Sequence, residues 1–199
     1  AYTNIDDPSA HFQAFLYTGN GSNRTITLPG NSDLKFDLYW YKQRSQAGHH
    51  RMFDTSRGLS LELYPDLNAA DSAATYFNNQ QANSFDIIAN DSATNTGDVT
   101  FANWQWKANG GTTTSVSESQ YNAGGTYQKN ETAGFSIVSY TGIDTVGEVT
   151  HGLTTQPQVV IVKRRNSTGN WATYHESAGI TGTLFLDTTA AKGNTTAYF

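Results

Sequence analysis

Short runs of apolar and aromatic residues alternate along the chain with clusters of Gly, Asn and Ser. Residues 12–18 alternate with a period near two, as expected of a strand with one buried face. Residues 38–42 and 159–163 are nearly continuous apolar or aromatic runs, which predict central strands covered on both faces. Similar signals, separated by turn residues, recur at residues 24–28, 51–53, 59–64, 84–88, 99–107, 171–174 and 183–186. This spacing predicts an all-β sandwich.

The sequence contains an internal repeat. Residues 12–19 (FQAFLYTG) correspond to residues 135–142 (FSIVSYTG) at an offset of 123. Residues 37–44 and 158–165 correspond at an offset of 121, and a loop would absorb the two-residue slip. The second offset also pairs Phe53 with Tyr174, Asp54 with His175, Gly58 with Gly179, Tyr64 with Phe185, and Asp66 with Asp187. Because the matched positions are those of strands and turns, the repeat indicates a frame that serves shape and contact.

The repeat predicts three parts. Residues 1–108 form a first β-sandwich unit, residues 109–130 a Gly/Ser/Thr-rich linker, and residues 131–199 a second, truncated copy of the same unit. The second copy stops before any counterpart of residues 84–88 and 99–107. A sandwich without its closing strands has unpaired edges. We therefore expect either that the sequence is a fragment or that a neighbouring subunit supplies the missing strands.

Composition narrows the function classes. Hydrophobic residues make up 37%, aromatic residues 13% and charged residues 15% of the 199 residues, which is typical of a folded chain with a neutral polar surface. The net charge of -5 is dispersed, and without a basic face we expect no nucleic-acid partner. No apolar run approaches the ~20 residues of a membrane span. The absence of cysteine excludes disulfides and thiolate chemistry.

Several motifs carry a family resemblance. The segments WYKQR (40–44), FDTSRG (53–58) and WQWKA (104–108) are followed by KRR (163–165), GNW (169–171) and YH (174–175). In this order they resemble a phage and marine-virus family with W-x-K-x-R, F-D-x-x-R-G and W-x-W-K-A motifs. The resemblance implies a concanavalin-type, lectin-like jelly roll and a role as a tail-fibre or other virion structural protein.

Aromatic residues are the candidates for ligand binding. Trp104 and Trp106 lie two apart in one predicted strand and therefore share a face, where they could stack on a sugar. The interpretation that we favour for these two is that they fill the sandwich core. Trp171, next to the Gly169–Asn170 turn, is the better candidate for an exposed aromatic residue, and Tyr174 completes the candidate ligand-binding set.

Basic residues recur at the end of the same strand in both copies, as Lys42 and Arg44 and as Lys163 and Arg165. Two interpretations remain open. The strand ends could be held by ion pairs, with Asp37 or Asp54 as partners. Alternatively, the four side chains could contact a neighbouring subunit.

Metal and catalytic sites are not predicted. The five histidines lack metal-ligand spacing. Asp54, Asp86 and Asp91 could supply oxygens to Ca²⁺, but they follow no calcium-loop pattern, and turn-capping is the preferred interpretation. The glutamates are scattered, and there is no Gly-x-Ser-x-Gly motif. We therefore expect no cofactor and no enzymatic activity.

The resulting hypothesis is a bacteriophage virion surface protein, either a tail-fibre or appendage module or a capsid decoration protein. It would be assembled in the host cytoplasm, form homo-oligomers, contact other virion subunits and bind a host surface glycan. A free-standing carbohydrate-binding module is the alternative hypothesis, and a polysaccharide depolymerase is the third.

Overall fold

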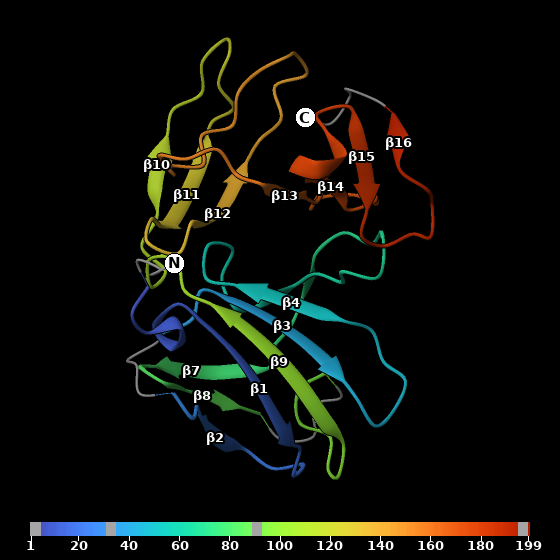
Figure 1. The fold of residues 1–199 in the computed structure, drawn as a ribbon. Helices are drawn as coiled ribbons and strands as arrows, with labels where there is room; N and C mark the ends of the chain where they lie inside the picture. The colour runs from blue at the N-terminus through green and yellow to red at the C-terminus, as the bar shows by residue number, and fades with distance from the viewer. Residues whose placement is uncertain (1–4, 31–34, 89–92, 195–198) are drawn as a thin grey trace.

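A computed structural model describes residues 5–30, 35–88, 93–194 and 199, and Figure 1 shows it as two β-rich halves, one above the other. Within the described residues, the N-terminal half contains a one-turn 3₁₀ helix, Pro8–Ala10, and nine strands. These are β1 (Phe12–Thr18), β2 (Arg24–Thr27), β3 (Leu38–Gln43), β4 (Arg51–Asp54), β5 (Leu61–Glu62), β6 (Ser72–Ala73), β7 (Phe77–Gln81), β8 (Ser84–Ile87) and β9 (Thr100–Trp106).

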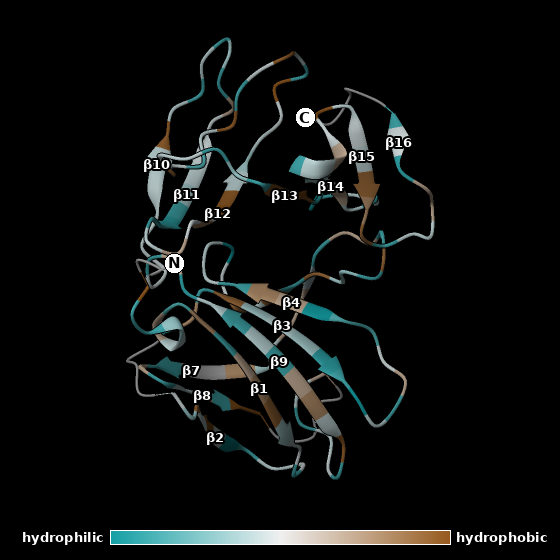
Figure 2. Cartoon of the chain, viewed as in Figure 1, coloured by the Kyte–Doolittle hydropathy of each residue, from teal (hydrophilic) through white to brown (hydrophobic). Residues whose placement is uncertain are grey.

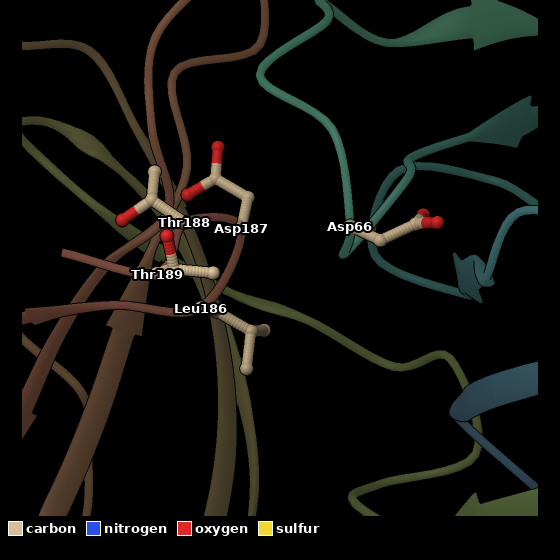
Figure 3. A pocket seen from close by; sticks show the side chains of 5 residues that line it. All are labelled: Asp66, Leu186, Asp187, Thr188 and Thr189. Atoms are coloured by element: carbon tan, nitrogen blue, oxygen red, sulfur yellow. The ribbon is translucent and has the colours of Figure 1, made fainter.

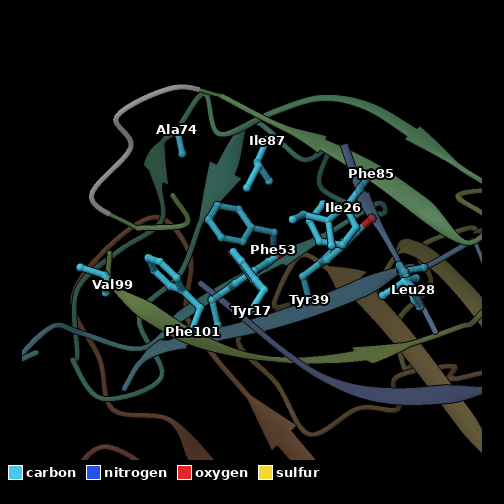
Figure 4. Packing of buried hydrophobic residues seen from close by; sticks show 12 residues of the cluster. Tyr17, Ile26, Leu28, Tyr39, Phe53, Ala74, Phe85, Ile87, Val99 and Phe101 are labelled. Carbon is cyan, nitrogen blue, oxygen red and sulfur yellow. The ribbon is translucent and has the colours of Figure 1, made fainter. Parts of the chain in front are cut away.

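Two antiparallel sheets pack face to face in this half. One sheet has the strand order β1-β9-β3-β4 and the other the order β2-β8-β7. Their facing side chains form the main core, shown in Figure 4. Tyr39, Tyr41 and Phe53 from the first sheet meet Phe85 and Ile87 from the second, and all five are fully buried. The predicted all-β sandwich is therefore confirmed.

Alternation along each strand explains how the first sheet obtains this core. Odd-numbered residues of β3 and β9 point inward, so Tyr39, Tyr41 and Phe101 are buried, whereas Trp40 and Trp104 between them are only half-buried. The side-chain period of two places the latter on the opposite face of the sheet. Hydrophobic colouring is visible along β4 and β9 (Figure 2).

The part of the C-terminal half that the structure describes contains two further antiparallel sheets. One has the order β10-β11-β12 and the other the order β13-β14-β15-β16. The strands are β10 (Thr114–Val116), β11 (Gly125–Asn130), β12 (Phe135–Tyr140), β13 (Val159–Val162), β14 (Ala172–His175), β15 (Gly182–Phe185) and β16 (Gly193–Asn194), with a 3₁₀ turn at Glu176–Ala178.

The segment 109–130, predicted as a linker, is largely structured. It contains β10 and β11, and all six residues of β11 pair with β12. Gln128 of β11 is 1% exposed, and its Nε2 donates to Thr55 Oγ1 at 2.8 Å and to Ser56 Oγ at 2.7 Å in the N-terminal half. The sequence did not predict this strand because its apolar content is low. Its one fully buried side chain is a glutamine, whose amide group is satisfied by hydrogen bonds.

The strand pairings of the two halves repeat at the predicted offset of 121. Val159 opposite His175 repeats Leu38 opposite Asp54. In the same way, Thr173–Leu184 repeats the Met52–Leu63 bridge, and Thr183–Gly193 repeats Glu62–Ser72. Even a turn recurs, since Gly58 and Gly179 both have positive φ, at +90° and +77°. Strands β13 to β16 therefore reproduce the register of β3 to β6.

The prediction of two central strands holds for one of them. β3 lies between β9 and β4, whereas β13 is the outermost strand of its sheet. Val159 and Ile161 of β13 are accordingly 50% and 43% exposed. The apolar run at residues 159–163 suggested a central strand because it resembles its counterpart β3, which is central. β13 itself has a neighbouring strand on one side only. The described residues contain no helix long and apolar enough to cross a membrane.

Candidate functional site

The outer face of the first sheet carries a row of aromatic side chains. We call Phe12 of β1, Trp40 of β3, and Trp104 and Trp106 of β9 the aromatic face. Strand pairing brings them together, since Phe12 lies opposite Trp106 and Trp40 lies opposite Trp104. The ring centroids are 4.9 Å apart in the first pair and 6.4 Å apart in the second.

Trp104 and Trp106 therefore share a face, as predicted, but this face points away from the main core. Neither residue belongs to the core cluster between the two sheets, and both are half-buried. The interpretation that they fill the core is wrong. The side chains of β9 that point into the core are those of Phe101, Asn103 and Gln105. Phe12 and Trp40 were not predicted as members, since only the strand order reveals that β1 and β3 both flank β9.

The C-terminal half covers part of the aromatic face. Phe135 of β12 stacks on Trp106 with ring centroids 6.3 Å apart and an interplanar angle of 25°. At the other side, Trp40 and Leu38 pack against a small cluster of Met52, Leu63 and Trp171. Phe12 remains 38% exposed. The exposed end of the aromatic face is thus Phe12 on the edge strand β1, while Trp104 stays half-buried.

Trp171 and Tyr174 are not exposed. Trp171 is 3% exposed and packs against Met52 and Leu63, while its Nε1 donates to Tyr64 O at 2.8 Å. Tyr174 is 9% exposed and lies 5.8 Å from the ring of Phe199. The expectation for Trp171 fails because the turn before it lies against the N-terminal half rather than in solvent. Both side chains are therefore buried, and ligand binding by them stays a prediction.

A hydrogen bond to His50 holds the Trp40 ring of the aromatic face in place. Trp40 Nε1 donates to His50 Nδ1 at 2.9 Å, so the Nδ1 atom accepts and carries no proton. Burial lowers the pKa of His50 below its ordinary value of 6.5; Asp66 opposes this shift and Lys42 adds to it. The hydrogen bond and the lowered pKa both favour the neutral ring with its proton on Nε2.

This arrangement predicts a pH-dependent stability. Because the pKa of His50 is lower in the folded state, the unfolded chain binds the proton more tightly, and the stabilisation is present above pH 6.5 and declines below it. In a His50→Gln variant the amide oxygen can accept from Trp40 at every pH. Urea unfolding at pH 8, 6.5 and 5 should show wild type losing more free energy of unfolding on acidification than the variant, up to the ~1 kcal/mol of one hydrogen bond. Parallel losses would contradict this assignment.

The four basic residues have partners inside the chain or face solvent. Lys42 Nζ donates to Gln43 O at 2.6 Å, and Arg44 is exposed. Lys163 Nζ donates to Asn68 O at 3.2 Å and to Gly169 O at 2.9 Å. Arg165 Nε pairs with Asp71 at 2.9 Å.

Of the two interpretations, ion pairing applies to Arg165, with Asp71 as the partner rather than Asp37 or Asp54. Asp54 pairs with Arg57 at 2.5 Å, and Arg57 in turn lies 3.9 Å from Asp71. Arg165 and Lys163 thereby connect the second half to the loop that follows β5. A contact of the four residues with a neighbouring subunit stays a prediction.

An open hollow of about 540 Å³ lies between the halves, lined by Asp66, Leu186, Asp187, Thr188 and Thr189 (Figure 3). Asp66 and Asp187 correspond to each other in the internal repeat, and their carboxylates accept equivalent hydrogen bonds. Asp66 Oδ1 accepts from His50 N at 3.1 Å, and Asp187 Oδ1 accepts from Trp171 N at 3.0 Å. Both carboxylates are therefore caps that hold the start of a strand.

The aspartates considered for Ca²⁺ have other roles. Asp54 Oδ1 accepts from Arg57 N at 2.9 Å, which is the predicted turn-capping, and Asp86 Oδ1 accepts from Thr25 Oγ1 at 2.6 Å. Asp91 lies outside the described residues. Within the part of the chain that the structure describes, no three His, Asp or Glu side chains are grouped to hold a metal ion.

Comparisons with known proteins define the family of the chain. Searches among curated proteins and among solved structures gave no match. Residues 7–199 match one family profile, which spans both halves of the fold. The chain therefore belongs to the family described as Domain of unknown function (DUF7483).

Proposed function

We propose that this chain is a structural protein of a bacteriophage virion surface, in a tail fibre, an appendage or a capsid decoration, and that it binds a host surface glycan on the aromatic face. The all-β frame with its internal repeat supports a role in shape and contact. The resemblance of the W-x-K-x-R, F-D-x-x-R-G and W-x-W-K-A segments to virion proteins supports the location.

One observation carries the glycan proposal: Trp104 is half-buried on an outer sheet face, with Trp40 opposite it and the half-exposed Phe12 on the neighbouring strand. Aromatic rings offer apolar surface with fixed orientation, onto which the apolar face of a pyranose can stack. Because each ring is held by packing against its neighbour, the surface is formed before the ligand arrives, which limits the entropic cost of binding.

Trp104→Ala is expected to weaken glycan binding at least about tenfold, which corresponds to ~1.4 kcal/mol. An array of bacterial surface polysaccharides, followed by titration of the best ligand, measures the effect. Tyr121→Ala is the matched control, since Tyr121 is 66% exposed and lies outside the aromatic face. A wild-type protein that binds no glycan, or equal binding by both variants, would refute the glycan site.

The virion assignment has a separate test. Antibody labelling of purified particles in electron microscopy is expected to locate the chain on the particle surface. If the chain is absent from particles yet binds a glycan, the free carbohydrate-binding module is the correct function. Release of oligosaccharides from capsule by the purified protein would instead establish the depolymerase.

A further inference from the structure

The first sheet has an unprotected edge at β1. The strand order β1-β9-β3-β4 gives β1 a neighbouring strand on one side only (Figure 1). With seven residues, β1 is the longest outermost strand of the sheets that the structure describes. Edge strands are usually blocked against further pairing by charged side chains, proline or a bulge. Residues 12–18 (FQAFLYT) contain neither a charge nor a proline, and they pair with β9 without a register shift.

The backbone of β1 offers a set of free hydrogen-bonding groups along this edge. Gly19 N donates to Val99 O at 2.8 Å, so the odd-numbered positions of β1 direct their backbone groups toward β9. The N–H and C=O groups of Phe12, Ala14 and Leu16 therefore point away from β9. Within the part of the chain that the structure describes, none of these groups has a hydrogen-bond partner.

The side chains of the same three residues are exposed. Phe12 is 38% exposed, Leu16 is 59% exposed, and Ala14 between them is exposed as well. They lie on the outer face of the sheet, because the residues that alternate with them are more buried. The free stretch ends at Thr18, whose carbonyl oxygen accepts from Arg24 Nη1 at 2.9 Å. Free backbone groups and exposed apolar side chains thus coincide over residues 12–16.

This stretch is complementary to a second copy of itself. When two β1 strands pair antiparallel with Ala14 opposite Ala14, Phe12 of each copy lies opposite Leu16 of the other. Each of these three pairs exchanges two main-chain hydrogen bonds, so every free N–H and C=O group of the stretch obtains a partner. Small side chains meet at the centre and large apolar side chains meet on either side of it. No like charges oppose each other, since the stretch has no charged residue.

We propose that β1 is the interface of a symmetric dimer of this chain, in which it pairs antiparallel with β1 of a second copy and Ala14 lies opposite Ala14. Strand addition then joins the two four-stranded sheets into one continuous sheet. Because the two-fold axis is perpendicular to this sheet, the aromatic faces of both copies point to the same side and can meet one host surface together. The inference deepens the proposed function, and this last step rests on the proposed glycan site.

Sedimentation equilibrium of the whole protein is expected to give a dimer, with twice the 21.7 kDa mass of the chain. Ala14→Lys and Ala14→Glu each place two like charges opposite one another at the dimer centre, and each should raise the dissociation constant at least about tenfold. An equimolar mixture of the two variants should dimerise again, because lysine then lies opposite glutamate. Thr114→Lys, at an exposed position of the edge strand β10, is the matched control and should leave the dimer intact.

A wild-type protein that sediments as a monomer at every concentration would overturn the inference, as would a dimer that tolerates Ala14→Lys. A mixture of the lysine and glutamate variants that stays monomeric would overturn it too, since the two alanines are opposed in the proposed register. Circular dichroism of each variant identifies loss of fold.

Should the variants unfold, hydrogen exchange of the wild-type protein provides a second test. The amides of Phe12, Ala14 and Leu16 should exchange faster on dilution, in step with dissociation of the dimer, and exchange that is independent of concentration would contradict the interface. Neither measurement involves a glycan or a virus particle, so failure here is distinguishable from failure of the proposed function.

Discussion

Asp37→Asn is expected to reduce the free energy of unfolding by about 3 kcal/mol. The Asp37 carboxylate is fully buried and accepts four hydrogen bonds. Its donors are Thr55 Oγ1 at 2.6 Å and the backbone N–H groups of Ala108, Gly110 and Gly111 at 2.6, 2.9 and 2.7 Å. Asparagine replaces one acceptor oxygen by an NH₂ group, which would face buried N–H donors and leave them unpaired.

The location of these bonds explains the size of the effect. Asp37 precedes β3, and the three amides lie just after β9, so the carboxylate closes the sheet at the point where the chain leaves the first half. Denaturant unfolding measures the loss, and Asp98→Asn, at an exposed loop position, should change stability by no more than about 0.5 kcal/mol. A loss below ~1 kcal/mol for Asp37→Asn would show that the carboxylate does not organise this loop. The counterpart of Asp37 in the second half is Gln158, so this group of hydrogen bonds to a buried carboxylate is specific to the first half.

Trp171→Ala is expected to cost about 4 kcal/mol of stability, within the range for a buried tryptophan. The side chain fills the space between Met52 and Leu63, and its Nε1 donates to the carbonyl oxygens of Tyr64 and Leu67 at 2.8 and 3.1 Å. Removal creates a cavity between the two halves and leaves two acceptors without this donor. Thermal unfolding followed by near-ultraviolet circular dichroism measures the loss.

Two variants make this experiment specific. Trp171→Phe retains most of the apolar contact but not the donor, and it should cost less than alanine. Tyr121→Ala, at a 66% exposed aromatic residue, should be close to neutral. If Trp171→Ala were as stable as wild type, Trp171 would not connect the two halves. Because the substitution affects folding, any loss of glycan binding that it causes would not identify a ligand contact.

The local pattern of apolar, polar and turn residues was sufficient to predict where the strands lie. The predicted boundaries of residues 12–18 agree with β1, and the runs at 38–42, 51–53 and 171–174 agree with β3, β4 and β14 to within two residues. Alternation and turn residues are local signals, and they do not depend on what the strand packs against. The failures are at positions where the environment is set by distant parts of the chain. Gln128 in the predicted linker is buried because Thr55 and Ser56 bind it.

The sequence by itself determined the all-β class, the strand positions and the offset of 121 at which pairings recur. Periodicity shows which side chains share a face of a strand, and it cannot show which of the two faces meets another layer. Only the tertiary structure decided that Trp104 and Trp106 point away from the main core, that Trp171 is buried, and that β13 is an edge strand. The physical reason is that burial and edge position depend on neighbouring strands, and those neighbours are brought together only when the chain folds.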